Sequence, residues 1–437
     1  MGEARALAVA LAPDFAELPS TSPQETDGPL DWPGYGTARK LAAERTGERE
    51  SVLCGVGTLG GARAVLIAFE FGFFGGSVGS AAGERVVRAF AHALAQRLPV
   101  VSLLATGGSR MQESMVSLRQ LQRIAAARAC LAEAGLPHVA VLRNPTTGGV
   151  WASLGASADV IVALAQAQIG FAGRRVRPPG DDHAYRAEGQ FAAGNVDEVV
   201  TPDDLPAVLA QWLELLRGNA DPAPVPNALG TAEPAAGGWD AVRLTRAAVR
   251  PRADAYLDDY FTARRTISGD RCGGVDDGVR CGVGLHDGRP IAFAAQLGTP
   301  TTPAGFRTAT RLLRLADRLR LPVLTLVDTP GAANDDRAER AGLGPSIAEL
   351  FGAIASARVP VTTLVIGEGG SGGALALAAP DNTWITPDAY FSVIAPELAA
   401  AILKRPATEV PAVADALRLR PEDLVALGAV RGIAGTR

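Results

Sequence analysis

Two stretches of this sequence are near copies of each other and decide its fold. Residues 97–109 read RLPVVSLLATGGS, and residues 320–332 read RLPVLTLVDTPGA. In each, a proline ends a helical pattern and an apolar run leads into a small-residue turn that contains glycine. The offset is 223 residues (320 against 97). Agreement over this length predicts two copies of one folded unit.

The same register extends to both sides of these stretches. Leu136-Pro137 corresponds to Val359-Pro360 at the same offset, and residues 82–85 correspond to residues 304–307 with one gap. The apolar spacing predicts strand, helix and strand in each copy. The expected ranges are 64–69, 84–96 and 100–105 in the first copy, and 291–295, 307–319 and 323–327 in the second. Strands that alternate with helices predict an α/β fold.

The boundaries follow from composition. Residues 218–240 are rich in Pro, Ala and Gly and lack a helical or strand period, which predicts a linker. We expect residues 1–36 to form an extended N-terminal arm, because Pro, Ser and Gly are frequent from Pro19 to Gly36. The two domains are then predicted at 37–217 and 241–437.

Composition excludes several classes of protein. With 437 residues, 47% hydrophobic, 20% charged and a net charge of −4, the chain is a folded globular protein and not a polybasic nucleic-acid binder. No stretch of 18 apolar residues predicts a membrane span. Four scattered cysteines predict a reducing, cytoplasmic location, and neither they nor the four dispersed histidines have the spacing of a zinc site.

Each copy contains two glycine turns that follow apolar strands. They are TGGS at 106–109 and PTTGG at 145–149, then DTPGA at 328–332 and GEGGSGG at 367–373. Glycine lets backbone N–H groups approach an anion without an intervening Cβ, and two such turns can hold one oxyanion. One turn alone is as readily a structural connection, but four turns in register favour an oxyanion site.

Other motifs match poorly. No turn contains the lysine of a P-loop, and the G-x-G-x-x-G spacing at Gly367 lies too late in its domain for a dinucleotide site. Ser77 and Ser371 fit the pattern of a hydrolase nucleophile turn. However, no histidine follows His286, and the expected helix after Ser77 starts too far on.

The motifs together resemble a known family, the carboxyltransferase of acetyl-CoA carboxylase, with both subunits in one chain. The first half resembles the β subunit and the second half the α subunit, over residues 28–430. The β-like motifs are FEF at 69–71 with GGSVGS at 75–80, GER at 83–85, GGSRMQE at 107–113, PTTGGV at 145–150 and IGFAG at 169–173. The α-like motifs are GFR at 305–307, LP at 321–322, DTPGA at 328–332, GEGGSGGAL at 367–375 and YFSVI at 390–394.

The resemblance implies two crotonase-like domains in tandem, each a spiral of ββα units. It implies transfer of a carboxyl group from carboxybiotin to the α-carbon of an acyl-CoA of the acetyl or propionyl type. In the β-like half, N–H groups would stabilise the thioester enolate; in the α-like half, they would stabilise the ureido oxygen of biotin. The residues implied for these roles are Gly107, Gly108, Gly148 and Gly149, and then Gly331, Ala332, Gly370, Gly372 and Gly373.

Several charged residues lie beside the glycine turns. The coenzyme A contacts expected from the resemblance are Arg110, Gly173, Arg174 and Arg175, although the last two arginines are as readily surface charges. Glu113 is expected to be a structural carboxylate at a helix start rather than a general base. Asp328 is expected to cap its turn.

The sequence departs from the family pattern at three places. The four-cysteine zinc ribbon of the β subunit is absent, so no zinc is expected. Residues 177–183 (RPPGDDH) replace a longer helical segment, and residues 333–337 (ANDDR) replace a tyrosine- and glycine-rich stretch. These changes affect the expected acyl-CoA entrance and the expected biotin contacts.

The expected partners follow from what the chain lacks. Its only lysines are Lys40 and Lys404, and neither adjoins a methionine as a biotinylated lysine does. A separate biotin carboxyl carrier protein and a biotin carboxylase are therefore expected, with a homodimer or a trimer of dimers as the assembly. The alternatives are a biotin-independent malonyl-thioester decarboxylase and an acyl-CoA-binding scaffold without turnover.

Overall fold

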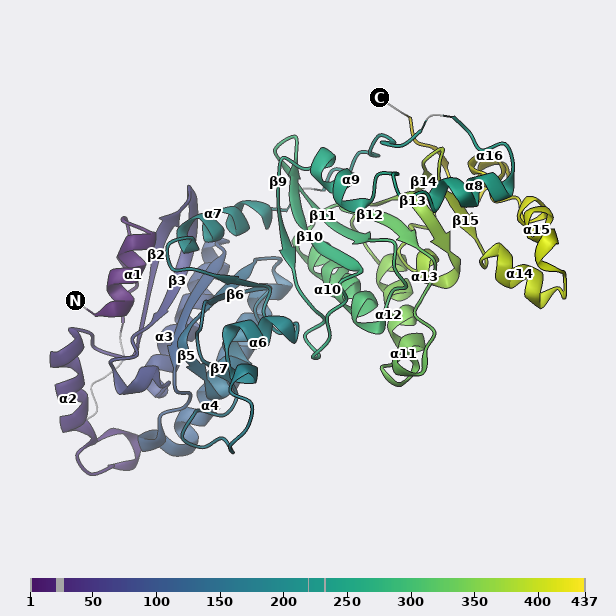
Figure 1. Ribbon diagram of the computed structural model, residues 1–437. Coiled ribbons are helices and arrows are strands. Elements are labelled where there is room, and N and C mark those ends of the chain that lie inside the picture. The colour runs from purple at the N-terminus through teal and green to yellow at the C-terminus, as the bar shows by residue number, and fades with distance from the viewer. Residues whose placement is uncertain (1, 21–26, 219, 232, 436–437) are drawn as a thin grey trace. The chain divides into compact units, whose positions relative to one another are not determined.

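The computed structural model describes residues 2–20, 27–218, 220–231 and 233–435. The chain divides into two compact units, Met1–Glu214 and Leu215–Arg437, coloured purple to teal and teal to yellow in Figure 1. Each unit has its own sheet and its own core.

The first unit is built on a mixed sheet of order β1-β2-β3-β4-β5-β6-β8. An antiparallel hairpin starts it, and the following strands pair in parallel, which requires crossover connections such as helices between them. The strands are β1 (Ala16–Glu17), β2 (Val52–Leu59), β3 (Ala62–Phe69), β4 (Val100–Thr106), β5 (His138–Thr147), β6 (Val160–Leu164), β7 (Ile169–Gly170), which pairs with the end of β5, and β8 (Glu198–Val200).

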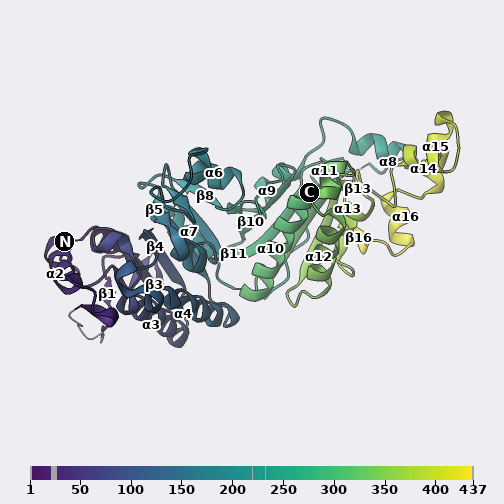
Figure 2. The ribbon, with the colours of Figure 1, turned by 90° about the horizontal axis from the view of Figure 1, so that it is seen from below.

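Helices α3 (Ser80–Gln96) and α4 (Ser114–Glu133) lie side by side against this sheet (Figures 1 and 2). The buried face of α3 carries Val86, Ala89, Phe90 and Ala93, whose spacing matches the helical period. The helix expected from residue 84 begins one turn earlier, because small residues directly after Gly79 allow it. The remaining helices are α2 (Tyr35–Thr46), α5 (Gly148–Val150) with a π-turn over Trp151–Gly155, α6 (Ala187–Ala192) and α7 (Leu205–Leu215).

The second unit repeats this plan in the same register. Val100 pairs with His138 in the first sheet, and Val323 pairs with Val361 in the second, both at the offset of 223. Both sheets also shift register at the same step, just before Thr106 and Thr329. The predicted α/β duplication is confirmed.

The elements of the second unit give a sheet of order β16-β14-β13-β12-β11-β10-β9, with β15 on the end of β13. Its strands are β9 (Ala263–Ile267), β10 (Val279–His286), β11 (Arg289–Gln296), β12 (Val323–Thr329), β13 (Val361–Gly370), β14 (Thr383–Ile385), β15 (Tyr390–Ser392) and β16 (Gly432–Ile433). Its helices are α8 (Gly238–Thr245), α9 (Ala253–Tyr260), α10 (Pro303–Leu319), α11 (Asp336–Arg340), α12 (Leu343–Ala355), α13 (Ser371–Leu375), α14 (Pro396–Ile402), α15 (Val410–Ala416) and α16 (Pro421–Ala426).

The N-terminal segment differs from the extended arm predicted for residues 1–36. Glu3–Leu11 forms helix α1, which packs on β2 and β3. Its buried residues are Ala4, Ala8 and Leu11, spaced to share one helix face. β1 then pairs with β2. The prediction of an arm is wrong in these parts because the Pro- and Gly-rich residues begin only after them; residues 21–26 lie outside the described part of the chain.

The described residues of the segment 218–240 contain little regular structure, yet part of them is buried. Ala223 and Ala228 lie in the core of the second unit, and α8 begins at Gly238. Among the described residues, no helix is long and apolar enough to cross a membrane.

Candidate active site: paired glycine turns

The two glycine turns of the first unit follow β4 and β5 and lie against each other. Gly108 and Gly148 have left-handed φ values of +104° and +75°. A Cβ on Gly148 would lie 2.9 Å from the Cα of Gly108, closer than real Cβ contacts allow. Glycine is therefore required at Gly148 both for conformation and for this approach.

The second unit brings its two turns together in the same way. A Cβ on Gly370 would lie 2.1 Å from the carbonyl oxygen of Pro330, and one on Gly373 would lie 2.3 Å from the amide nitrogen of Ala332. The turns after β12 and β13 are therefore in direct contact. Parallel strands end at the same sheet edge, which is where α/β proteins place ligands.

Several of the amides in the turns are already hydrogen-bonded within the protein. In the first unit, the N–H of Gly107 donates to the Gly75 carbonyl (2.8 Å) and that of Gly148 to the Phe171 carbonyl (3.0 Å). The N–H groups of Gly108 and Gly331 donate to the hydroxyls of the threonines two residues before them, at 3.0 and 3.1 Å. These four amides are therefore used within the protein, and at Gly108, Gly148 and Gly331 glycine also supplies a positive φ that other residues rarely adopt.

The backbone N–H groups of Ser109 and Ala332, which occupy equivalent positions in the two units, differ from the amides above. Val78 forms an isolated parallel bridge with Ser109, and Thr301 forms one with Ala332, both at the offset of 223. In each bridge the residues before and after Ser109 or Ala332 make the hydrogen bonds to Val78 or Thr301. The N–H groups of Ser109 and Ala332 themselves therefore point away from the bridge. Within the described residues, neither has a protein acceptor.

The second turn of each unit leads into a helical segment. Gly149 and Gly372 lie in the first turn of that helical segment, where backbone N–H groups have no intrahelical acceptor. A Cβ on Gly372 would meet no atom within 4 Å, and the nearest atom to one on Gly107 is the Gly75 oxygen at 3.5 Å. The Cβ positions of Gly107 and Gly372 are therefore open, whereas a Cβ on Gly149 would lie 2.3 Å from the Cδ1 atom of Leu121.

Arg110 is not positioned to bind coenzyme A. Its side chain is fully buried, and its guanidinium makes hydrogen bonds to Glu50 (2.5 and 3.1 Å), Ser51 (2.9 Å) and Ser77. Burial alone would raise the pKa of the Glu50 carboxyl, but the Arg110 charge and hydrogen bonds hold that pKa below its usual range. The assignment of Arg110 as a coenzyme A contact is therefore corrected to a structural role.

Glu113 also has a structural setting. Its carboxylate accepts hydrogen bonds from the hydroxyl of Tyr35 (2.6 Å) and from the N–H of Ser80 (2.5 Å), the first residue of α3. It therefore caps α3 rather than its own helix, α4. In the second unit, Asp328 is likewise buried and accepts two hydrogen bonds from Arg250, at 2.6 and 2.7 Å.

The loop after β7 passes beside the turns of the first unit. A Cβ on Gly173 would lie 3.7 Å from the Thr147 hydroxyl oxygen. Arg174 and Arg175 in the same loop are exposed. Their position leaves both guanidinium groups accessible to a ligand that enters along this loop.

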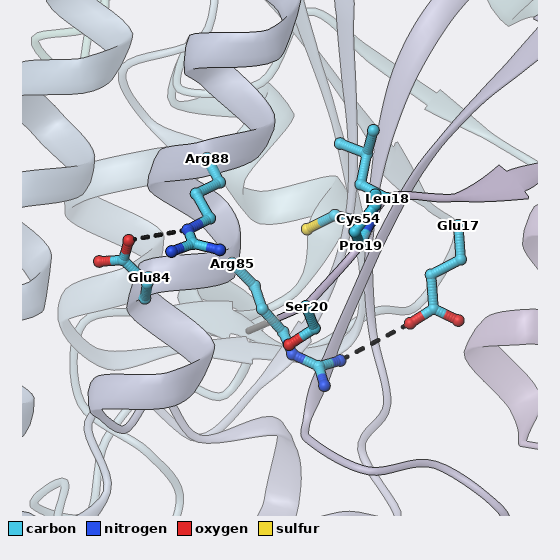
Figure 3. A pocket seen from close by; sticks show the side chains of 8 residues that line it. All are labelled: Glu17, Leu18, Pro19, Ser20, Cys54, Glu84, Arg85 and Arg88. Carbon is cyan, nitrogen blue, oxygen red and sulfur yellow. Dashed lines mark hydrogen bonds and ion pairs between the residues drawn. The ribbon is translucent and has the colours of Figure 1, made fainter. Parts of the chain in front are cut away.

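A small pocket lies elsewhere, between β1, β2 and α3 (Figure 3). Arg85 points into it and pairs with Glu17, while Arg88 pairs with Glu84. None of its eight lining residues belongs to the glycine turns. Its acidic and basic groups are mutually paired, so it offers no excess charge for an ion.

The described residues contain no cluster of three or more His, Cys, Asp or Glu side chains that could hold a metal ion. All four cysteines are free thiols. Sequence reasoning missed Ser109 as an available amide, and it missed Tyr35 and Glu50 as partners of Arg110. Only the bridge register could have identified Ser109, and a sequence alone does not contain it.

Both units of the chain match known protein families. The family described as "Acetyl co-enzyme A carboxylase carboxyltransferase-like" matches residues 235–435, and the family described as "Carboxyl transferase domain" matches residues 31–179. The two matches fall in the second and first units, respectively.

Individual relatives match over most of the chain. The acetyl-coenzyme A carboxylase carboxyl transferase subunits beta/alpha of Salinispora tropica is 39% identical, covering 96% of this chain and 79% of the relative. A probable biotin-dependent acyl-coenzyme A carboxylase beta3 subunit of Mycobacterium bovis is 34% identical, covering 90% and 82%. The crystal structure of transcarboxylase 12S, a hexamer, superposes with a TM-score of 0.81 at 21% identity, covering 99% and 86%, which confirms the crotonase-like fold.

Proposed function

Because this chain belongs to the acetyl-CoA carboxylase carboxyltransferase family, in which the β-like and α-like subunits are joined, we propose that it transfers a carboxyl group from carboxybiotin to the α-carbon of an acyl-CoA. The observation that carries this proposal is the pair of abutting glycine turns, repeated in both units in one register. Two negative charges develop in this reaction, one on each substrate, and the chain has one pair of turns for each.

In the first unit, the N–H groups of Ser109 and Gly149 are the proposed donors to the thioester oxygen. When the α-proton leaves, negative charge moves onto that oxygen as the enolate forms. Donors that are fixed beforehand stabilise this charge more than that of the neutral thioester, which lowers the barrier. Gly108 and Gly148 support these donors by allowing the turns to meet, and Gly107 leaves space beside them.

In the second unit, the N–H groups of Ala332 and Gly372 take the equivalent role toward the ureido oxygen of biotin. That oxygen becomes negative when the carboxyl group leaves the adjacent nitrogen. Gly370 and Gly373 are required for the contact between the turns, and Gly331 supplies a φ of +143°. The open space beside Gly372 leaves room for a planar ureido group.

Coenzyme A is expected to enter beside the loop after β7. Arg174 and Arg175 are the proposed contacts for its phosphates, since both side chains are exposed and arginine binds phosphate through paired N–H groups. Gly173 in the same loop lies beside Thr147. Arg110 takes no part in this contact.

The reaction requires partners that carry and load the biotin. The only lysines, Lys40 and Lys404, lack the methionine neighbours of a biotinylated lysine, so the proposed donor is a separate biotin carboxyl carrier protein charged by a biotin carboxylase. Free thiols at all four cysteines favour a cytoplasmic setting.

A second copy of the chain is the other proposed partner. Each unit exposes large apolar side chains next to its turns, and large exposed apolar groups are typical of interfaces. Phe171 and Val393, which directly follow β7 and β15, are 71% and 73% exposed. We expect a homodimer or a trimer of dimers by light scattering; a monomer at micromolar concentration would contradict this assembly.

Release of CO2 from malonyl-CoA, with and without free biotin, tests the proposed reaction in reverse. The expected result is loss of the carboxyl group only when biotin is present, because biotin must accept it. Release at the same rate without biotin would establish a malonyl-thioester decarboxylase instead. Binding of acyl-CoA with no release under either condition would favour a scaffold.

A further inference from the structure

The turn after β4 is attached to a buried ionic network that reaches it from the N-terminal part of the chain. Arg110 directly follows this turn, and its guanidinium forms two hydrogen bonds with Glu50 and one with the hydroxyl of Tyr35 (3.0 Å). All three residues are at most 2% exposed. The network is therefore shielded from water, where hydrogen bonds to charged groups are strong.

The same guanidinium also holds a neighbouring turn. It donates to the carbonyl of Ser77 (2.7 Å) and to its hydroxyl (3.3 Å). The backbone N–H of Arg110 donates to the Val78 carbonyl (3.0 Å), and the N–H of Val78 donates to the Gly108 carbonyl (2.9 Å). Arg110 thus fastens residues 77–78 to the peptide units on both sides of Ser109.

A second carboxylate closes the network. Glu113 lies 3.7 Å from the Arg110 guanidinium and accepts the hydroxyl hydrogen bond of Tyr35. Because Glu113 also binds the first N–H of α3, the start of that helix is tied to the same group of side chains. Ser117 of α4 adds a link by donating to the Val78 carbonyl (2.7 Å).

We propose that Arg110, with Glu50 and Tyr35, is a positioning residue that fixes the Ser109 N–H in the direction needed to stabilise the enolate. This inference rests on the proposed function. Residues 106–109 include two glycines, and a glycine turn has few side chains of its own to hold it. An amide donor must stay within about 0.5 Å of its productive place to be effective. The buried side chains around Arg110 supply that restraint.

The second unit holds its turn by a different residue pair. The position equivalent to Arg110 is Ala333, and the anchor is Asp328, which pairs with Arg250 from the segment between α8 and α9. Damage to the Arg110 network should therefore affect the acyl-CoA side alone. Variants of the Arg110 network should therefore lower kcat without changing the KM for biotin.

The test uses the full-length variants Tyr35→Phe, Glu50→Gln and Arg110→Lys in the malonyl-CoA and biotin assay. A loss of roughly tenfold or more in kcat is expected, while the Kd for acetyl-CoA and the KM for biotin stay within twofold of the wild type. Tyr35→Phe removes only one hydroxyl and should fold as the wild type does. Arg110→Lys should lose more than Tyr35→Phe, because lysine lacks the paired donors.

The matched control is Asp159→Asn, which disrupts the partly buried pair with Arg128 (2.7 Å) at the opposite ends of the strands. It should lower the melting temperature without changing kcat. If the Arg110 variants behave like this control, the network is merely structural and the proposal fails. If the Kd for acetyl-CoA rises in parallel with the loss of kcat, Arg110 contacts the ligand and the proposal is also overturned.

Amide hydrogen exchange gives a readout that does not depend on catalysis. Glu50→Gln is expected to speed exchange at least tenfold in peptides covering residues 105–113, with no change in peptides covering residues 328–334. Unchanged exchange at 105–113 would contradict the proposal. An inactive wild-type enzyme would instead contradict the proposed function, and the exchange experiment would still test the network.

Discussion

At the scale of single residues, the glycines of the turns have separable physical roles. Gly148 needs both a left-handed conformation and room for Gly108, whereas Gly372 has an ordinary φ and no neighbour near its missing Cβ. Gly148 therefore allows the two turns to pack together, whereas Gly372 leaves open space beside its turn. Substitutions at the two positions should therefore differ in their effect on stability.

Gly148→Ala is expected to disturb both folding and activity. The added Cβ would clash at 2.9 Å with the Gly108 Cα, and alanine disfavours a φ of +75°. We expect the free energy of unfolding to fall by about 1–3 kcal/mol and kcat by about 100-fold, measured by denaturation and steady-state kinetics. Gly352→Ala at an exposed position of α12 is the control, with about 1 kcal/mol of added stability and unchanged kcat. A fully active Gly148→Ala enzyme would contradict the packing argument.

His138 predicts a pH dependence of stability. Burial, with a smaller contribution from the Arg128 charge, lowers its pKa from 6.5 to about 3, so the folded state keeps the ring neutral. Below pH 6.5 the unfolded chain binds a proton that the folded chain does not, and stability falls as the pH falls. Between pH 8 and pH 5 the wild type should lose roughly 2 kcal/mol more than His138→Gln in urea unfolding. Parallel pH profiles for the two proteins would contradict this assignment.

At the scale of elements, α1 shows how a short helix can belong to a core. Ala8 is 0% exposed against the first hairpin, while the adjacent Val9 is 39% exposed. Ala8→Asp should therefore cost about 3 kcal/mol or more, because it buries an unpaired charge. Val9→Asp should stay within about 0.5 kcal/mol of the wild type. Equal melting temperatures for the two variants would show that α1 is not docked.

Local patterns predicted most of the repeated elements. The expected strand at 100–105 and helix at 307–319 are contained in β4 and α10, because apolar period and proline boundaries are encoded within short stretches. The network of Tyr35, Glu50 and Arg110 was not predictable in this way. Its members are 15 to 75 residues apart (35, 50 and 110), and only the folded sheet brings them together.

The site was predictable at the level of turns but not of atoms. The sequence placed the oxyanion donors on glycines, yet Gly107 and Gly148 use their amides within the protein. Which N–H groups remain available depends on strand register and on isolated bridges. Those features involve Val78 and Thr301, residues far from the turns in sequence.

At the scale of the whole molecule, the chain supplies two halves of one reaction but not its biotin. We expect no malonyl-CoA from acetyl-CoA, bicarbonate and ATP when the chain is assayed alone. Addition of a biotin carboxylase and a biotinylated carrier should restore the product, measured as incorporation of labelled bicarbonate. Product formation by the chain alone would contradict the need for a separate carrier.

The central claim is that each unit holds one of the two substrates at its own turns. The most direct measurement is the KM for malonyl-CoA and for free biotin in Gly107→Ala and Gly372→Ala, two changes that each unit can accommodate. Gly107→Ala should raise the malonyl-CoA KM about tenfold or more and leave the biotin KM within twofold, and Gly372→Ala should do the reverse. The claim is contradicted if both variants affect the same substrate or if neither changes a KM.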